Sequence, residues 1–298
     1  MKKIFLCLAI LGGLRANAQQ DPLSAQYVNA PILVNPAYSG LSKDLNLVAD
    51  YRKQWAGFAG SPQTTTVIGH MAMRKNIMGA GIKVVQDKVG VNSSTDVQAS
   101  YAYHLPVTKE TTLSFGMQLG MINYRTDYSE LVINPNDPGF TSTSEWQPNF
   151  GAGLILTNQK YFLSVSSMKM LEPKAQLAKQ GLYRRDINVM AAYTFQLTSR
   201  LRLKPFAMYR GAAESAASYD IGMCLLGDDS YTIGAFTRRL NEYGLIAQLK
   251  LGEMVRVGYA FELPTNKSTG TGFTSHELQI IFRTAVLTSH EIGAVRNF

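Results

Sequence analysis

The 298-residue sequence contains very little cysteine, and this limits how its fold can be stabilised. Its two cysteines are Cys7 and Cys224. Cys7 lies within an apolar run that we interpret below as part of an export signal, so the mature chain would keep only Cys224. A secreted chain with one thiol cannot form an internal disulfide. Packing and hydrogen bonds must therefore stabilise the fold.

Long apolar runs and basic tracts are also missing. After residues 4–14, no apolar stretch approaches the ~20 residues that a membrane-spanning helix needs. The 29 basic and 21 acidic residues are mixed along the chain, so their surplus of positive charge is spread out. This pattern gives no indication of a nucleic-acid partner.

The residues of a catalytic or metal centre do not occur in a suitable pattern. The four histidines, His70, His104, His276 and His290, are far apart, and none has the spacing to another histidine or a cysteine that metal binding requires. No G-x-S-x-G nucleophile motif is present. We therefore expect neither an enzyme nor a bound cofactor or metal.

The first residues have the three parts of a signal peptide. Met1 is followed by Lys2 and Lys3, then by the apolar residues 4–14, and then by the A-x-A sequence that ends at Ala18. This order predicts cleavage after Ala18, so that residues 1–18 are removed from the mature protein. The alternative, a membrane anchor, is disfavoured because the apolar run is too short.

Most of the remaining chain alternates between apolar and polar residues with a period of two. In residues 111–121, one face holds Leu113, Phe115, Met117, Leu119 and Met121. The other face holds Thr112, Ser114, Gly116, Gln118 and Gly120. An apolar face opposite a small, polar face is typical of a strand between lipid and a wet lumen. Residues 187–197 and 255–263, including inward Glu262, repeat the pattern.

The alternation predicts about fourteen strands. We place them at residues 45–52, 63–74, 78–87, 95–105, 111–126, 147–157, 160–168, 186–197, 200–210, 217–226, 230–240, 243–251, 254–263 and 275–284. This assigns residues 19–44 to an N-terminal periplasmic, plug-like segment, residues 45–284 to the barrel, and residues 285–298 to a C-terminal tail.

The predicted connections alternate between long and short. The long ones cover residues 53–62, 88–94, 127–146, 169–185, 211–216 and 264–274, and only the turn at Asn241 breaks the order. Short periplasmic turns and longer extracellular loops are typical of an outer-membrane barrel. We therefore predict an all-β, transmembrane outer-membrane β-barrel of about fourteen antiparallel strands, with both termini on the periplasmic side. A soluble barrel or sandwich would not need this asymmetry.

Residues 26–40 are too rich in proline and asparagine to form a regular element, so we expect them to dock onto something larger. A barrel of this size leaves space inside that its own side chains do not fill. The segment is long enough to enter that space from the periplasmic side. The inward glycines make room either for such a plug or for a passing solute, and the sequence does not decide between them: Gly79, Gly81, Gly116, Gly120, Gly151 and Gly153.

Two short stretches carry the most specific pattern in the chain. The first contains Gln26, Tyr27, Asn35, Pro36, Ala37, Tyr38 and Gly40, and the second contains Tyr51, Arg52, Gln54, Trp55, Gly57, Gly60 and Pro62. On these residues the chain resembles the PorP/SprF family, outer-membrane components of the type IX secretion system. The resemblance extends over nearly the whole mature chain.

The resemblance implies a non-enzymatic barrel in the outer membrane of a Gram-negative bacterium, with a link to gliding motility. Its partners would be outer-membrane lipid, a secreted adhesin-like substrate held by its C-terminal domain, and other secretion components or the periplasmic motor ring. The two stretches would bind the partner or form the plug. The alternative is a porin-like diffusion channel for small solutes.

Overall fold

The computed structural model describes residues 24–73, 76–129, 142–174, 183–213, 215–265 and 272–285. The predicted signal peptide, His290 and nearly all of the predicted tail lie outside these residues. Among the described residues, no helix is long and apolar enough to span a membrane.

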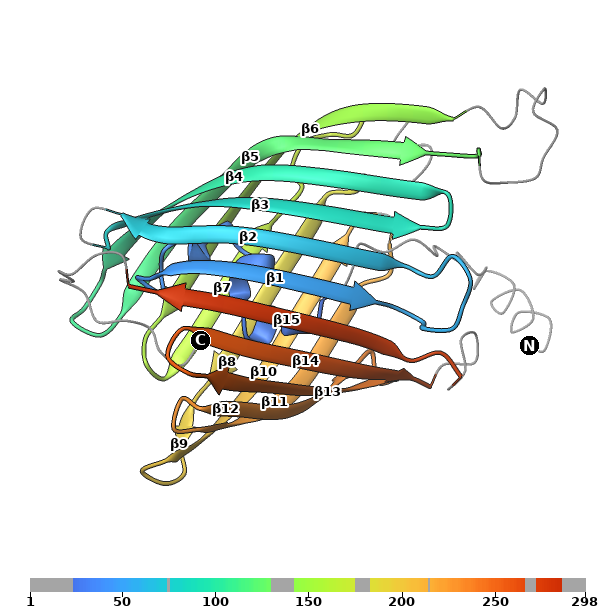
Figure 1. The fold of residues 1–298 in the computed structure, drawn as a ribbon. Coiled ribbons are helices and arrows are strands. Elements are labelled where there is room, and N and C mark those ends of the chain that lie inside the picture. Colours follow the sequence, from blue (N-terminus) through green and yellow to red (C-terminus); the bar gives the residue numbers. More distant parts are fainter. Residues whose placement is uncertain are drawn as a thin grey trace, which may run out of the picture.

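The chain forms a closed barrel of fourteen antiparallel strands, as the sequence predicts (Figure 1). The strands are β1 (Leu45–Lys53), β2 (Gln63–Met73), β3 (Met78–Val89), β4 (Asn92–Pro106), β5 (Thr112–Thr126), β6 (Thr143–Thr157), β7 (Tyr161–Ser167), β8 (Asp186–Tyr193), β9 (Phe195–Gln196), β10 (Leu201–Ala212), β11 (Ser218–Gly227), β12 (Tyr231–Arg238), β13 (Glu242–Leu251), β14 (Val255–Pro264) and β15 (Ser275–Thr284). Short β9 continues β8 beyond Thr194, and both pair with β10. Pairing of β1 with β15 closes the sheet on itself, because Leu45 lies opposite Thr284.

The two faces of the strands follow the predicted alternation. On β5, Leu119 points outward and is 64% exposed, whereas its neighbour Gln118 points inward and is 3% exposed. The same alternation places Ile187 and Tyr259 on the outside. Exposed apolar side chains on an outer barrel surface are suited to contact with lipid.

The two ends of the barrel differ in the length of their connections. We call one the short-turn end, where residues 74–77, 107–111, 158–160, 197–200, 228–230 and 252–254 join the strands. We call the other the long-loop end, with the connections 54–62, 90–91, 127–142, 168–185, 213–217, 239–241 and 265–274. The prediction of a long loop at residues 88–94 is wrong. Val89 pairs directly with Asn92, so these strands meet at a two-residue turn that begins at Gly90, with φ +58°.

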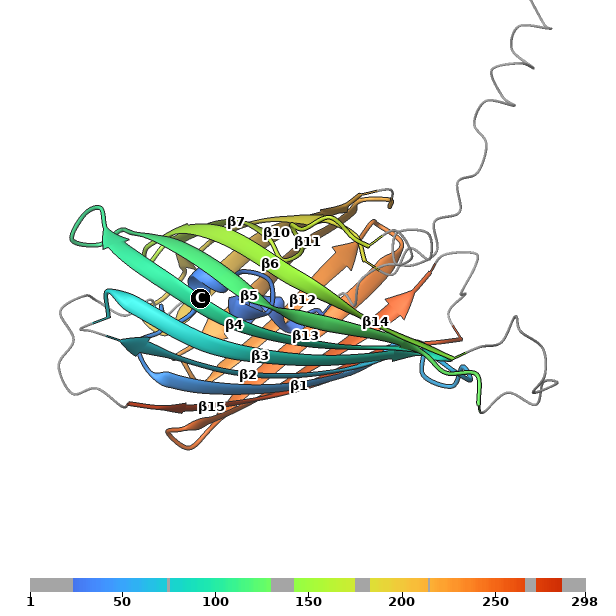
Figure 2. The same ribbon diagram turned by 90° about the horizontal axis from the view of Figure 1, so that it is seen from above.

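The lumen contains residues 24–44, which we call the inner segment (Figure 2). It makes three short 3₁₀ turns: η1 (Gln26–Val28), η2 (Pro31–Leu33) and η3 (Pro36–Tyr38). Its apolar side chains form one buried cluster with inward residues of the strands, among them Tyr27 with Phe206. The lumen around the inner segment is therefore packed by residues of the same chain.

The inner segment runs along the lumen from one end to the other. Ser24 contacts Glu277, near the start of β15 at the long-loop end. Gly40 lies against Gly79, at the start of β3 at the short-turn end. The barrel's own ends, Leu45 and Thr284, lie at the short-turn end as predicted, but the inner segment does not enter from there. The composition of the inner segment indicates that it docks, but it does not indicate from which end of the barrel the segment enters.

Candidate functional site

Asn35 fixes the part of the inner segment nearer the short-turn end to the barrel wall. Its side-chain oxygen accepts a hydrogen bond from the backbone N–H of Ala37 at 2.8 Å, which caps η3. Its amide nitrogen donates to the carbonyl oxygen of Leu154 at 3.1 Å and to the hydroxyl of Ser164 at 2.8 Å. Pro36 follows as the first residue of η3, where its missing N–H is not needed.

Three inward glycines of the wall let the inner segment approach the strands. A Cβ atom on Gly153 would lie 2.0 Å from the side-chain oxygen of Asn35. On Gly116 it would lie 2.1 Å from the backbone nitrogen of Ala37, and on Gly79 it would lie 1.8 Å from the carbonyl oxygen of Ser39. Such distances exclude any side chain at these positions. The sequence leaves open whether the glycines make room for a plug or for a passing solute. These three make room for the inner segment.

The other inward glycines serve the wall itself. A Cβ on Gly120 would lie 1.9 Å from the carbonyl oxygen of Val97, on Gly151 2.8 Å from that of Ser167, and on Gly81 2.8 Å from the hydroxyl of Ser100.

Two buried histidines hold the end of the inner segment. The backbone N–H of Gly40 donates to His70 Nδ1 at 3.1 Å. His104 contacts the carbonyl oxygen of Ser39 through Nε2 at 3.0 Å and the hydroxyl of Ser114 through Nδ1 at 2.8 Å. Gly40 has φ +73°, a conformation that glycine adopts without strain.

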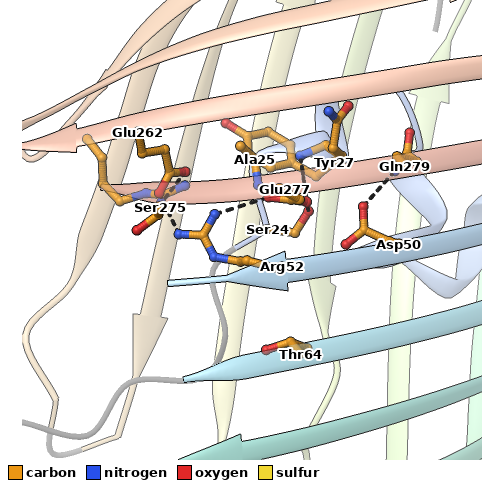
Figure 3. Close-up of polar contacts among 12 residues, drawn as sticks. Ser24, Ala25, Tyr27, Asp50, Arg52, Thr64, Glu262, Ser275, Glu277 and Gln279 are labelled. Atoms are coloured by element: carbon orange, nitrogen blue, oxygen red, sulfur yellow. Dashed lines mark hydrogen bonds and ion pairs between the residues drawn. The ribbon is translucent and has the colours of Figure 1, made fainter. Parts of the chain in front are cut away.

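Nearer the long-loop end, a chain of alternating charges crosses the inside of the wall, and Figure 3 shows its part at Arg52, Glu262 and Glu277. We call it the charge network; it consists of Arg52, Arg210, Asp220, Arg238, Glu262 and Glu277. Arg52 bridges Glu262 and Glu277, with 3.1 Å to the Glu277 carboxylate. Arg238 bridges Glu262 at 3.1 Å and Asp220 at 3.0 Å. Because these groups are buried, each needs its partners to offset the loss of hydration.

The charge network also holds the start of the inner segment. The carboxylate of Glu277 accepts hydrogen bonds from the Ser24 hydroxyl, from the Ala25 N–H at 2.8 Å and from the Gln26 N–H at 3.2 Å (Figure 3). The Tyr27 hydroxyl donates to Asp220 at 3.1 Å.

The connection between β1 and β2, residues 54–62, forms a loop on the rim, which we call the rim loop. The Gln54 N–H donates to the Pro62 carbonyl at 2.9 Å and closes its base. The Trp55 N–H donates to the Ser275 hydroxyl at 3.2 Å, and the Gly90 N–H donates to the Gly60 carbonyl at 2.9 Å. These bonds join the rim loop to the start of β15 on one side and to the turn between β3 and β4 on the other.

The rim loop has three residues with positive φ: Trp55 at +52°, Gly57 at +94° and Gly60 at +72°. The two glycines accept this conformation readily, whereas a bulky tryptophan does not. A residue held in an unfavourable conformation by its surroundings is a candidate for function. Phe58 is 54% exposed and packs edge-on against Phe273, with 5.7 Å between the ring centres.

The described residues of the connection after β7 are hydrogen-bonded to inward side chains at the same end. The carbonyl oxygen of Met168, just after β7, accepts from the side-chain amides of Gln118 at 3.0 Å and Asn149 at 2.8 Å. The Tyr183 hydroxyl donates to Asn149 at 2.8 Å. Burial raises the pKa of Tyr183 to about 12, which keeps this donor protonated.

The residues that the sequence singles out fall into three groups. Gln26, Tyr27 and Arg52 meet at the charge network. The second group lies in the lumen nearer the short-turn end and consists of Asn35, Pro36, Ala37, Tyr38 and Gly40. The third group lies in the rim loop and consists of Gln54, Trp55, Gly57, Gly60 and Pro62. Tyr51 joins none of these, because it points outward from β1, is 45% exposed, and bonds Gln63 on that face.

Sequence reasoning missed most of the charge network. The alternation places Glu262 on the inward face, but it does not single out Asp220, Arg238 or Glu277. Their common signal is a charged residue at an inward position near the long-loop end of a strand. Among the described residues, no group of three or more histidines, cysteines or carboxylates is arranged to hold a metal ion.

Comparisons with known proteins concern the sequence and the fold. A family profile described as "Type IX secretion system membrane protein PorP/SprF" matches residues 16–282. No curated protein sequence matches the chain. Among solved structures, the chain is similar to the outer membrane protein Omp33 of Acinetobacter baumannii, with 12% identity, a TM-score of 0.48, and coverage of 83% of this chain and 100% of that one.

A triple mutant of the Rhodopseudomonas blastica porin is also similar, with 9% identity, a TM-score of 0.36, and coverage of 81% of this chain and 99% of that one. The family profile spans the inner segment, the rim loop and almost all of the barrel. The chain therefore belongs to the type IX secretion system membrane protein PorP/SprF family and is an outer-membrane component of that secretion system.

Proposed function

We propose that this protein is a closed, non-enzymatic docking subunit, which uses its long-loop end to hold a secreted adhesin-like partner at the cell surface. The observation that carries the proposal is the occupied lumen. The inner segment is fastened near both ends of the barrel, by Glu277 at Ser24 and by His70 at Gly40. A barrel filled by its own chain serves attachment better than diffusion.

Packing beside the inner segment supports a closed state. Two cavities next to it have volumes of about 10 Å³ and about 50 Å³. Such volumes hold from one to a few water molecules. The porin-like channel is therefore the second candidate, and it requires the inner segment to leave the lumen.

The rim loop is the proposed contact surface for the partner. Its backbone is held by hydrogen bonds to Ser275 and Gly90, and it exposes Phe58. A preorganised loop loses little entropy when it binds, and exposed aromatic side chains are common anchors in interfaces. We propose that the C-terminal domain of the adhesin-like substrate binds here, with the long-loop end facing outward, as in other outer-membrane barrels.

The short-turn end would then face the periplasm. Contact there with other secretion components, including the periplasmic motor ring, would connect the barrel to gliding motility. The family supports interaction with components of the secretion system, and the identity of each partner belongs to this proposal.

Conductance in planar bilayers tests the closed state. The purified full-length barrel is expected to stay closed, whereas a variant lacking residues 26–40 should insert and conduct. If the intact barrel passes ions and small sugars freely, and the deletion conducts no better, the diffusion channel becomes the better assignment.

Co-purification from outer membranes tests the partner. We expect an adhesin-like chain to co-purify with the intact barrel, and Trp55→Ala to reduce both this recovery and surface display of the adhesin. Trp146→Ala is the matched control, because Trp146 points outward from β6 and lies away from the rim loop. Unchanged recovery with Trp55→Ala would remove the rim loop from the proposal.

A further inference from the structure

A small cavity lies in the lumen near the short-turn end, away from the charge network and the rim loop. Its volume is about 50 Å³. One side is formed by Val28 and Asn29 of the inner segment. The other side is formed by residues of β10 to β15 and of the turn between β11 and β12: Arg202, Lys204, Leu226, Asp229, Tyr231, Thr232, Gln248, Arg256, Ile281 and Arg283.

The lining of this cavity is strongly cationic. It includes Arg202, Lys204, Arg256 and Arg283, whereas Asp229 is the one carboxylate among the described residues that line it. Asp229 forms an ion pair with Arg202. The surplus is therefore three positive charges around a space that holds a few waters at most.

The cations have different surroundings. The Lys204 ammonium donates to the Val28 carbonyl at 3.3 Å, and the Arg283 guanidinium donates to Asn46 at 2.9 Å. The Asn46 side chain is uncharged, so its hydrogen bond does not neutralise Arg283. Arg256 has no hydrogen bond or ion pair within the described part of the chain.

Gln248 adds a donor without a partner. Its side chain lines the cavity, the residue is only 6% exposed, and its amide nitrogen makes no hydrogen bond. A buried N–H group without an acceptor costs free energy. An acceptor placed in the cavity would remove that cost.

We infer that this cavity binds a single oxyanion, a carboxylate or phosphate group that enters from the short-turn end. The excess cations supply the attraction, the Gln248 amide supplies a directional donor, and the volume suits one such group. Arg202, Arg256 and Arg283 are half-buried, so the cavity stays in contact with the solution at that end. A free phosphate and an acidic side chain of a periplasmic partner have the same chemistry here.

Calorimetric titration of the full-length barrel in non-ionic detergent tests the site. Inorganic phosphate and acetate are titrated separately, at constant ionic strength set with chloride. We expect saturable binding of at least one of them. Loss of a charged donor should weaken binding about tenfold in Arg256→Gln, and Gln248→Leu should weaken it by a smaller factor.

Arg200→Gln is the matched control, because Arg200 lies at the same end of the barrel, with its side chain 84% exposed and outside the cavity lining. It should bind the anion as the native barrel does. Preference for phosphate would assign a phosphate ligand, and preference for acetate would assign a carboxylate of a partner. Absence of binding by both anions, or equal binding by the native barrel and both cavity variants, would overturn the inference. Gln248→Leu retains every charge and keeps the test valid if Arg256→Gln does not fold.

Discussion

The two ends of the inner segment are held by different physical means. At Ser24–Tyr27 the wall contributes charged side chains, with Glu277 and Asp220 accepting hydrogen bonds from the segment. At residues 35–40 the wall contributes neutral acceptors, histidines and glycines, and the backbone of the segment approaches that of the wall closely at Gly79 and Gly116.

This difference shows how one short segment is both anchored and positioned. The charge network takes its partners from six strands, and its Arg52–Glu277 ion pair joins β1 to β15 where the barrel closes. The contacts nearer the short-turn end require glycine in the wall, because any side chain there would overlap the inner segment. Loss of charge should therefore most affect how the inner segment is held near the long-loop end. Added side-chain volume should most affect how it is held near the short-turn end.

The largest effect is expected for Arg238→Met. The substitution removes the cation that lies between Asp220 and Glu262 and leaves two buried carboxylates with fewer partners. Breaking such a buried pair costs about 3–5 kcal/mol. Urea unfolding of the barrel in detergent, followed by tryptophan fluorescence, measures the loss.

Arg200→Met is the control, since the exposed pair of Arg200 with Asp228 should contribute only about 0–1 kcal/mol. Equal losses for the two variants would mean that the charge network does not stabilise the folded barrel.

The second effect is expected for Gly116→Val. Its Cβ would overlap the backbone of Ala37, so the inner segment must shift or the wall must give way. Overpacking of this kind costs about 1–3 kcal/mol, and displacement of the segment should raise conductance in planar bilayers.

Gly272→Val is the matched control, because no atom of the described residues lies within 4 Å of a Cβ at Gly272. If Gly116→Val remains closed and as stable as the native barrel, the glycines do not position the segment.

The strands of the barrel could be predicted from the sequence because their alternation is a local property. The predicted range 111–126 corresponds to β5, Thr112–Thr126, and the outward phase of Leu119 is correct. Predicted strand ends are wrong where pairing with a neighbouring strand extends a strand beyond its alternating pattern. β6 begins at Thr143 rather than at residue 147, because it pairs with Thr126 at the end of β5.

The candidate site could be predicted only in part. Motif residues such as Asn35 and Gly40 are close in sequence and make contacts that follow from their chemistry. The charge network could not be found in this way, because Arg52 and Glu277 are far apart in the chain and meet only through the register of β1 with β15. The direction of the inner segment also depends on those contacts.

The third effect is expected for Asn35→Ala, which sharpens the comparison at the neutral end. The substitution removes the cap of η3 and the bonds to Leu154 and Ser164. We expect a loss of about 0.5–2 kcal/mol, the usual value of an N-cap, without a change in conductance. Asn29→Ala removes a bond inside the segment, to Gln26, and should cost less. If Asn35→Ala loses more stability than Arg238→Met, the neutral contacts stabilise the barrel more than the charge network does.

The smallest effect on stability, and the sharpest on topology, is expected for an epitope tag inserted after residue 20. Ser24 is bonded to Glu277, whose partner across the sheet is Arg52 near the long-loop end of β1. If the signal is cleaved after Ala18, five residues precede Ser24, and they span at most about 17 Å. The nine residues of β1 alone extend about 30 Å. The point of insertion therefore lies at the long-loop end, because the native residues before Ser24 are too few to reach the short-turn end.

This tag should be accessible from the same side of the membrane as a tag at Ala59 in the rim loop, and from the side opposite to a tag at Lys109 in a short turn. Antibody labelling of intact and permeabilised cells compares the three positions. A tag after residue 20 that labels together with the one at Lys109 would show that the start of the inner segment is not held at the charge network. In that case the ionic contacts of Ser24–Tyr27 would not anchor the segment, and the neutral contacts of Asn35–Gly40 would have to retain it alone.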